Sequence, residues 1–162
     1  MAKKNLGTRI SDAPLVIGIG PGFTAAGDCH FVIETQRGEH LGEVIREGSA
    51  IPNTGIPGNV GGYTVERLLK ASADGIMPPV ARIGDVVEKG QIVARCGDEP
   101  VYARLRGIVR GMLQEGAPVK KGLKIGDVDA RIEEKLCYTI SDKARKIGNG
   151  VAEAIDFVYK TK

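Results

Sequence analysis

The sequence contains the stretch Gly75-Ile-Met-Pro-Pro-Val-Ala-Arg-Ile-Gly-Asp-Val-Val-Glu-Lys-Gly90, and its pattern returns 32 residues later as Gly107-Ile-Val-Arg-Gly-Met-Leu-Gln-Glu-Gly-Ala-Pro-Val-Lys-Lys-Gly122. Six of the sixteen aligned positions are identical. Each copy predicts a strand, a sharp turn and a further strand, the last at residues 91–95 and 123–125. The shared glycines mark the turns, because glycine adopts positive φ without steric cost. The sequence therefore predicts a duplicated β unit over residues 71–130.

The duplicated unit resembles the barrel-sandwich hybrid fold of lipoyl and biotinyl domains, in which two similar four-stranded halves pack about a pseudo-twofold axis. In a carrier domain of this kind, an exposed Lys at the tip of the hairpin between the halves receives the cofactor. Here that hairpin corresponds to residues 96–102, Cys-Gly-Asp-Glu-Pro-Val-Tyr, which contain no Lys. Lys89 and Lys121 belong to the repeated turns. We therefore expect no covalent lipoyl or biotin group, and a scaffold or docking module instead.

Residues 1–70 are rich in turn-forming residues and predict a small glycine-rich α/β segment. Apolar, β-branched runs predict strands at residues 14–19 and 30–36, and a weaker one at 41–45. Alternation with a period of two divides the second strand into two faces, Phe31, Ile33 and Thr35 on one, and His30, Val32, Glu34 and Gln36 on the other.

Two helices are expected. Thr64 can cap a short helix from residue 65 to about residue 70, and Ser141 can cap a longer one in which Asp142 suits the positive first turn. The longer helix has an apolar stripe at three- and four-residue spacing, formed by Ala144, Ile147, Val151, Ala154, Ile155 and Val158. Residues 148–150, Gly-Asn-Gly, interrupt this stripe and predict a kink, a restart or a close backbone approach.

The expected fold is therefore mixed and mainly β, in three parts. Residues 1–70 form the glycine-rich α/β segment, and residues 71–130 form a barrel-sandwich hybrid-like domain with the internal 32-residue repeat. Residues 131–162 form a C-terminal helical segment that packs back on the N-terminal part.

Composition excludes several classes of protein. The chain has 162 residues, of which 23 are Gly and 8 are Pro, a share below that of low-complexity disorder. It has four Tyr, three Phe and no Trp, too few aromatic rings for a surface that stacks unpaired bases. A net charge of +3 does not by itself imply a nucleic-acid or membrane partner, and no apolar run is long enough to span a bilayer. The absence of a secretory signal and the three widely spaced cysteines, Cys29, Cys96 and Cys137, lead us to expect a reducing cytoplasm.

Two glycine-rich loops are candidate ligand sites. Residues 18–27 follow a predicted buried strand, and such a loop can turn backbone N–H groups toward a phosphate or carboxylate. Only about nine residues separate this loop's Phe23 from the next strand, too few for the crossover helix of a dinucleotide-binding unit. Residues 52–63 precede a predicted helix but lack the Lys-Ser/Thr pair of a nucleotide-binding P-loop. Purely structural turns are the alternative for both loops, whose candidate residues are Gly20, Gly22, Thr24, Asn53, Thr54, Gly61 and Gly62.

The predicted strand between these loops carries ionisable side chains. His30 and Glu34 share one face and Arg37 follows, so the strand could hold an acid–base pair or bind an anion. No Cys or His spacing matches a zinc pattern, and we expect no metal site. A solvated strand face is the alternative. Secondary candidates, for which a structural ion-pair network is the alternative, are Asp127, Asp129, Ser141, Asp142 and Lys143.

Six longer strings are distributed over nearly the whole chain: Ala2-Lys-Lys-Asn-Leu-Gly-Thr8, Ala13-Pro-Leu-Val-Ile-Gly-Ile-Gly-Pro-Gly-Phe23, His30-Phe-Val-Ile-Glu-Thr-Gln-Arg-Gly38, Pro52-Asn-Thr-Gly-Ile-Pro-Gly58, Gly126-Asp-Val-Asp129 and Ile140-Ser-Asp-Lys-Ala-Arg145. Together they resemble the C-terminal part of the YqeB family, whose members are described as accessory proteins of selenium-dependent molybdenum hydroxylase systems. The resemblance implies a maturation role, with a molybdenum hydroxylase or another maturation factor as partner. It assigns no catalytic residue, and His40 does not carry over because Glu39 separates it from the preceding Arg-Gly.

Three hypotheses of function follow. The first is an accessory factor that binds an anionic ligand, such as a pterin phosphate or a selenium species, at the glycine loops near His30, Glu34 and Arg37. The second is a non-enzymatic docking scaffold in which those loops are structural. The third is a transferase or hydrolase that uses His30 or Cys29.

Overall fold

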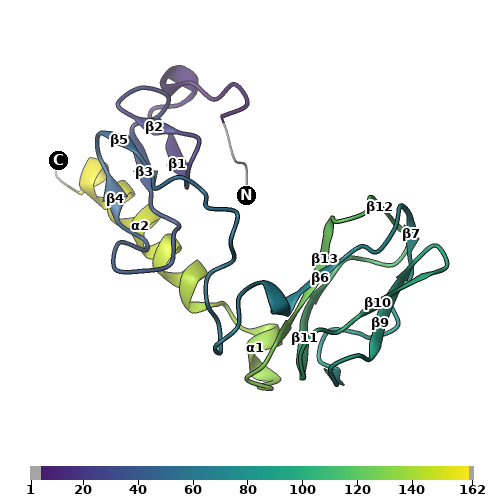
Figure 1. Cartoon of the computed structure of the whole chain (residues 1–162). Coiled ribbons are helices and arrows are strands. Elements are labelled where there is room, and N and C mark those ends of the chain that lie inside the picture. Colours follow the sequence, from purple (N-terminus) through teal and green to yellow (C-terminus); the bar gives the residue numbers. More distant parts are fainter. Residues whose placement is uncertain (1–4, 161–162) are drawn as a thin grey trace. The chain divides into compact units, whose positions relative to one another are not determined.

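The computed structural model describes residues 5–160 and divides them into two compact units (Figure 1). The first unit contains the residues up to Gly55 together with those from Ile140 onward, and the second is Ile56–Thr139. The chain is mainly β, with a long helix at its C-terminal end (Figure 1). The unit boundaries differ from the three expected segments, because residues on both sides of 71–130 pack with the second unit.

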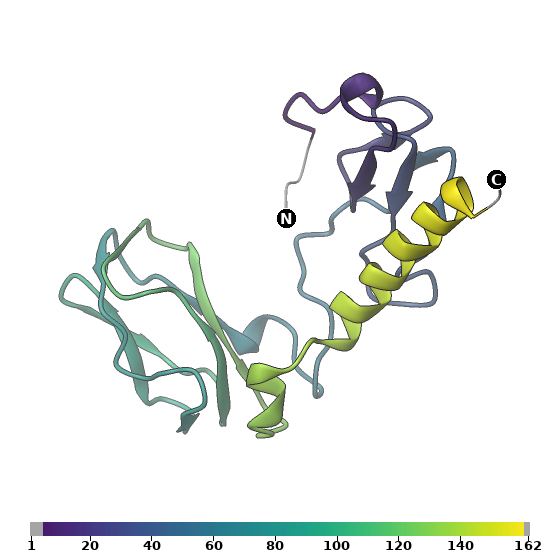
Figure 2. The same cartoon turned by 180° about the vertical axis from the view of Figure 1, so that it is seen from behind.

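The first unit is built on a small mixed sheet of strand order β1-β3-β4. Its strands are β1 (Ile17–Ile19), β3 (Phe31–Ile33) and β4 (Val44–Ile45), with β1 parallel and β4 antiparallel to β3. A separate antiparallel pair joins β2 (Thr24–Ala25) to β5 (Gly48–Ser49), and a 3-10 turn, η1, covers Ile10–Asp12. Helix α2 (Asp142–Tyr159) packs on all three strands of the sheet, as Figure 2 shows.

The central strand β3 is shorter than the expected strand 30–36, and both of its faces are covered. Phe31 and Ile33 pack against Ala154 of α2, whereas Val32 packs on the other side in a cluster with Cys29. The alternative of a solvated strand face is therefore wrong for β3. The reason is that β2 and the segment around Ala50 cover the side opposite the helix, which the alternation of residues along one strand does not reveal.

Helix α2 runs without interruption through its two glycines. The Ser141 side chain accepts a hydrogen bond from the Ala144 backbone N–H at 3.1 Å, which confirms the predicted cap. Of the three outcomes predicted for residues 148–150, the close backbone approach is confirmed, because a Cβ atom at Gly150 would overlap the Gly42 carbonyl oxygen. The stripe against the sheet is narrower than predicted: Ala144 and Ile155 are exposed, and the residues that pack are Ile147, Val151, Ala154 and Val158.

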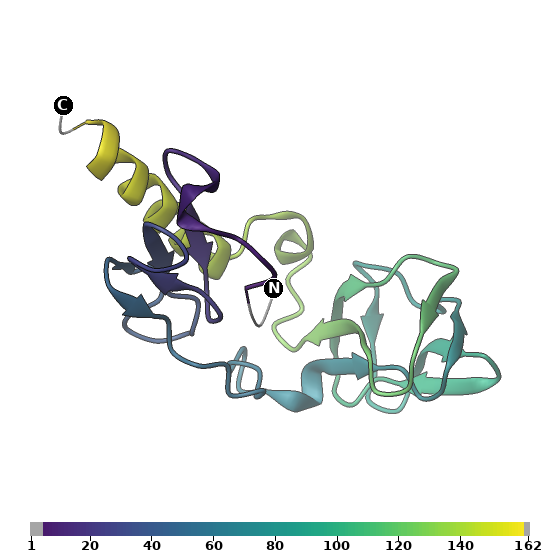
Figure 3. The ribbon, with the colours of Figure 1, turned by 90° about the horizontal axis from the view of Figure 1, so that it is seen from above.

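The second unit consists of eight short strands around a common interior (Figures 1 and 3). They are β6 (Leu68–Lys70), β7 (Gly75–Met77), β8 (Val86–Val87), β9 (Ile92–Cys96), β10 (Glu99–Tyr102), β11 (Gly107–Met112), β12 (Ala117–Val119) and β13 (Lys124–Asp129). A four-stranded sheet has the order β6-β13-β11-β8, and two further pairs are β12-β7 and β10-β9. A 3-10 turn η2 (Val65–Arg67) precedes β6, and the short helix α1 (Lys135–Tyr138) follows β13.

The pairing of these strands is reciprocal between the two copies of the sequence pattern. Strands β6 to β9 come from the first half and β10 to β13 from the second, and β6 pairs with β13 while β9 pairs with β10. Likewise β7 pairs with β12 and β8 with β11. The turn glycine of each half also bonds to the other half: Gly90 N–H donates to the Ala103 carbonyl at 2.8 Å, and Gly122 N–H donates to the Ala71 carbonyl at 2.9 Å.

The helix expected over residues 65–70 is wrong. Only Val65–Arg67 form a 3-10 turn, and the next three residues form β6, where pairing with β13 buries Leu69. Thr64 does not cap the turn: its hydroxyl and its N–H both donate to the Glu66 carboxylate, at 3.4 and 3.1 Å. Tertiary pairing of Leu69 thus overrides the weak helical preference of this segment.

Candidate functional site

The first glycine loop is closed by its own hydrogen bonds. Gly20 and Gly22 have φ of 82° and 102°, in the left-handed region that favours glycine. Gly20 N–H donates to the Ile33 carbonyl at 2.9 Å, and Thr24 N–H donates to the Asp28 carboxylate at 3.0 Å. These N–H groups are therefore engaged within the protein and are not free to bind an anion. A Cβ at Gly20 would lie 2.7 Å from Thr35 Oγ1, so this glycine allows the loop to approach Thr35.

Glu34 is a buried carboxylate held by three backbone donors. Its side chain accepts from Thr35 N–H and Gln36 N–H at 2.7 Å each, and from Ile51 N–H at 2.8 Å. Glu34 is 2% exposed. It fastens the turn after β3 to the segment that follows β5, so its first role is to position these two segments.

His30 and Cys29 do not form a catalytic pair. His30 Nδ1 accepts a hydrogen bond from Val16 N–H at 3.0 Å. The Cys29 thiol is fully buried and donates to the Phe31 carbonyl at 3.2 Å. Burial raises the pKa of Cys29, which keeps the thiol protonated, whereas a nucleophilic cysteine needs a lowered pKa.

Two cations meet where α2 begins. The Arg37 guanidinium pairs with the Asp142 carboxylate at 2.9 Å, although the two residues are 105 positions apart. Lys143 lies beside them, partly buried. Burial lowers the pKa of Lys143, and so does the nearby Arg37 charge, while Glu34 acts in the opposite direction. We call Arg37 and Lys143 the basic cluster. The sequence placed these residues in separate motifs, and folding brings them together.

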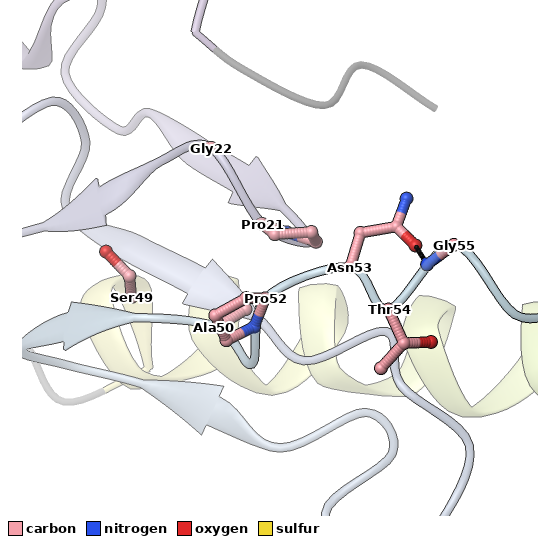
Figure 4. Close-up of a pocket in the computed structure, with 8 residues that line it drawn as sticks. All are labelled: Pro21, Gly22, Ser49, Ala50, Pro52, Asn53, Thr54 and Gly55. Atoms are coloured by element: carbon pink, nitrogen blue, oxygen red, sulfur yellow. Dashed lines mark hydrogen bonds between the residues drawn. The ribbon is translucent and has the colours of Figure 1, made fainter.

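A cavity of about 490 Å³ lies in the first unit (Figure 4). Eight residues line it: Pro21, Gly22, Ser49, Ala50, Pro52, Asn53, Thr54 and Gly55. Three of them, Gly22, Asn53 and Thr54, are predicted ligand-binding residues. Pro21, Pro52 and Gly55 lie in the two predicted loops but were not singled out, and Ser49 and Ala50 gave no signal in the sequence, because such residues in a turn-rich segment are ordinary. None of the eight is charged.

The remaining candidates belong to the second unit. Gly62 N–H donates to the Asn59 side chain at 3.0 Å within a tight turn, and Gly61 packs near the Arg131 side chain. The structure therefore does not gather Gly61 and Gly62 with the loop at Gly20 within one unit.

Asp127 and Asp129 join ion pairs on β13. Asp127 pairs with Lys124 at 2.6 Å and lies 3.6 Å from Arg67. Asp129, 3% exposed, binds the Arg131 guanidinium at 2.6 and 2.9 Å. Arg110 lies 3.4 Å from the same carboxylate and donates to the Leu136 carbonyl at 3.0 Å. Arg110 therefore connects the sheet to Leu136 of α1, and the role of this ion-pair network is structural.

Asp129 should make the second unit sensitive to acid. Its hydrogen bond from Arg131 is the main reason that its pKa lies below the usual value of 3.8. A carboxyl whose pKa is lowered by folding stabilises the protein fully above its unfolded pKa and loses that contribution as the pH falls through the folded pKa. We expect the stability difference between wild type and Asp129→Asn to be largest at neutral pH and to shrink below about pH 3.8. Urea unfolding as a function of pH measures this, and a pH-independent difference would contradict it.

No group of three or more His, Cys, Asp or Glu side chains within residues 5–160 is arranged to hold a metal ion. No helix in this range is long and apolar enough to cross a membrane.

Comparison with known proteins gives one strong likeness. A curated protein of Escherichia coli (strain K12), described as the uncharacterized protein YqeB, is 51% identical to the chain over 155 residues. The chain is similar to YqeB. This finding supports the resemblance to the YqeB family. The matched region covers 96% of the chain but 29% of YqeB, so the chain spans less than a third of that relative's length.

Two other comparisons add little. No model of a known protein family matches the chain. Among solved structures, an aspartoacylase family protein from Mesorhizobium loti is 14% identical, with a TM-score of 0.35, over 52% of this chain and 27% of that one.

Proposed function

We propose that this YqeB-like chain is a cytoplasmic accessory factor in the maturation of a selenium-dependent molybdenum hydroxylase, and that its first unit binds a small oxyanion at the basic cluster. The likeness to YqeB over 96% of the chain supports the family resemblance on which the maturation role rests. A molybdenum hydroxylase or another maturation factor is the proposed partner. The oxyanion site rests on the geometry of the first unit.

Lys143 is the observation that carries the oxyanion site. It is a partly buried cation beside a second cation, Arg37, and burial and that like charge both lower its pKa. Among the described residues Lys143 makes no hydrogen bond or ion pair, while Arg37 already pairs with Asp142. The Asp142 carboxylate pairs with Arg37, and Glu34 offsets part of the lowering of the Lys143 pKa, but the Lys143 ammonium has no directly bound anion among the described residues. A bound oxyanion would supply that direct partner.

The chemistry of the cluster suits an oxyanion such as phosphate or selenite. The planar guanidinium of Arg37 can donate two parallel hydrogen bonds to one anion, whereas the Lys143 ammonium acts as a point charge. The N-terminus of α2 adds a positive dipole end, which favours negative charge near its first turn. Glu34 accepts three backbone hydrogen bonds, so we expect it to position the Arg37 turn, while its charge acts on Lys143 without a direct hydrogen bond among the described residues.

Lys143→Met should abolish most of this binding. We expect isothermal titration of the full chain with sodium phosphate and with selenite to show at least about a tenfold loss of affinity in this variant. Lys146→Met is the matched control, because Lys146 is an exposed lysine on the same helix and lies outside the basic cluster. Equal affinity in all three proteins, or no binding by wild type, would refute the oxyanion site. In cells, the maturation role predicts that deletion of the gene lowers hydroxylase activity and that wild type restores it.

A second candidate function, a docking scaffold, is favoured by the second unit. The reciprocal pairing of β6 to β9 with β10 to β13 supports a barrel-sandwich hybrid built from the 32-residue repeat. The β9–β10 hairpin turns at Gly97 and Asp98 and offers no Lys for a cofactor. A scaffold predicts that residues 75–125 contact the hydroxylase and that Lys143→Met still complements the deletion. Loss of complementation by a folded Lys143→Met chain would favour the oxyanion function instead.

A further inference from the structure

Lysine residues gather in the second unit where β6 lies beside the start of β13 (Figure 1). Lys70 on β6 and Lys124 on β13 are directly opposed in this antiparallel pair, and both are exposed. Directly opposed side chains have Cβ atoms about 5 Å apart, so two like charges in these positions repel each other. The turn before β13 adds two more exposed lysines, Lys120 and Lys121. Backbone hydrogen bonds of 2.9 Å fix that turn to Ala71, the residue after Lys70.

Few carboxylates offset these charges. Asp127 pairs with Lys124 at 2.6 Å and also lies 3.6 Å from a fifth cation, Arg67, so one carboxylate serves two cations. The buried Nε atom of Arg67 has no hydrogen-bond acceptor within residues 5–160. Asp74 accepts a hydrogen bond from the Lys121 backbone N–H at 2.8 Å. In the same range, three side chains make no hydrogen bond or ion pair: Lys70, Lys120 and Lys121.

We call the five cations Arg67, Lys70, Lys120, Lys121 and Lys124 the cationic patch. The internal repeat provides a reference for it, because residues 32 positions apart pair in the same way. Lys70 is opposite Lys124, and their equivalents Tyr102 and Ile92 are opposite each other. Interior residues at equivalent positions are buried in both halves: Leu69 and Val101, Ala71 and Ala103, Met77 and Val109, and Val87 and Val119. The packing that the two halves share therefore does not require lysine at positions 70 and 124.

The charge of the patch is specific to one half of the repeat. The equivalent of Lys120 is Glu88, whose carboxylate pairs with Arg106 at 2.8 Å. Of the five cations of the patch, Lys121 alone has a cationic equivalent, Lys89. The same backbone thus carries uncharged and ion-paired side chains at one end and unpaired cations at the other. Positive charge that is not neutralised within the protein favours a partner of opposite charge.

We propose that the cationic patch docks an acidic segment of a partner protein. Carboxylates spaced along such a segment can meet the separate ammonium groups and avoid Asp74 and Asp127, which lie among the cations. A nucleic-acid backbone would instead carry a phosphate past each of these two carboxylates, and the residues of the patch include no aromatic ring on which a base could stack. The inference goes beyond the oxyanion site, because it uses residues of the second unit only.

Fluorescence anisotropy with a labelled peptide of alternating Glu and Ser tests this docking. We expect the full chain to bind this peptide at least about tenfold more tightly than a peptide with Gln in place of Glu, and added salt should weaken the binding. A thymidine oligonucleotide of equal length is the competing probe. Absence of binding by the acidic peptide, equal binding of the Gln peptide, or tighter binding of the oligonucleotide would each overturn the proposal.

Two equivalent lysines distinguish a local site from an effect of net charge. Lys121→Glu should weaken binding of the acidic peptide at least about fivefold, whereas Lys89→Glu should change it by less than about twofold. Both lysines are exposed and precede a glycine with positive φ, so the two substitutions perturb the fold alike. Equal losses in the two variants would overturn the proposal.

Lys70→Glu adds a readout that separates lost binding from lost folding. It should weaken binding of the acidic peptide at least about tenfold, yet its midpoint in urea should equal or exceed that of wild type. The reason is that the substitution replaces two like charges, those of Lys70 and Lys124, by an opposite pair. Unchanged affinity in this variant would overturn the proposal. Lys143→Met should bind the peptide like wild type, so failure of the oxyanion site and failure of the cationic patch are distinguishable.

Discussion

Gly150→Ala should destabilise the first unit by about 2 kcal/mol, whereas Gly148→Ala, on the same helix, should stabilise it by up to about 1 kcal/mol. At position 150 the added Cβ would overlap the Gly42 carbonyl oxygen and lie 3.1 Å from Ile33 Cγ2. Backbone cannot move aside cheaply, so the helix must separate from the sheet. At position 148 nothing lies within 4 Å of the added atom, and alanine is the better helix former.

The helical circular dichroism signal measures this contrast, because α2 provides most of the helix and belongs to the first unit. Both variants change glycine to alanine in one helix, so intrinsic helix propensity affects them alike. In urea unfolding, the midpoint of Gly150→Ala should therefore lie below that of wild type, and the midpoint of Gly148→Ala should lie above it. Similar midpoints for both variants would show that α2 does not pack on Gly42 as described.

Glu34→Ala should cost about 3 kcal/mol of stability, and Glu34→Gln about 2 kcal/mol. The alanine variant leaves three backbone N–H groups without their acceptor, those of Thr35, Gln36 and Ile51. A glutamine keeps the shape of the side chain, but its amide has one oxygen and one NH₂ group. Both oxygens of Glu34 accept from backbone N–H groups, so in the glutamine variant the NH₂ group must face at least one of these donors. A buried donor without an acceptor has given up its hydrogen bonds to water and gains none in the protein, which destabilises the folded state.

Glu43→Gln is the matched control for this prediction. Glu43 is also a glutamate in the first unit, but it is exposed, and its side chain pairs with His40 at 2.7 Å. Exposed pairs contribute about 0–1 kcal/mol, so this variant should unfold close to wild type. Equal losses for Glu34→Gln and Glu43→Gln in urea unfolding would contradict the structural role given to Glu34.

The Glu34 variants also bear on the oxyanion site. If Glu34 only positions the turn that carries Arg37, a Glu34→Gln chain that remains folded at low temperature should still bind phosphate, with weaker affinity. Binding that is unchanged would mean that the turn holds its shape without the carboxylate. The effect on affinity is expected to be smaller than that of Lys143→Met, which removes a charge from the cluster itself.

The elements that sequence predicted well are those with a strong local signal. Ser141 followed by Asp142 and a periodic apolar run predicted the start of α2, and the repeated glycines predicted turns at positive φ such as Gly84, Gly90 and Gly116. In each case one residue type has a conformational property that few others share. Such signals do not depend on what packs against the segment.

Segments whose state depends on a distant partner were predicted less well. Residues 68–70 form a strand because β13 lies beside them, and the face of β3 that carries Val32 is buried because Ala25 and Ala50 cover it. Local pattern alone cannot reveal these partners. For the same reason, the sequence singled out Arg37 and Lys143 but could not place them together.

By itself, the sequence determined a mainly β chain, the turns at its glycines, the cap of the C-terminal helix and the likeness to the YqeB family, because each rests on residue types at short range. Only the tertiary structure decided which candidates share a site. It closed the Gly20 loop with its own hydrogen bonds, separated Gly61 and Gly62 into the second unit, and joined the turn after β3 to the start of α2. Burial and pairing depend on residues more than a hundred positions apart, and the balance of desolvation and charge at Lys143 exists only once they meet.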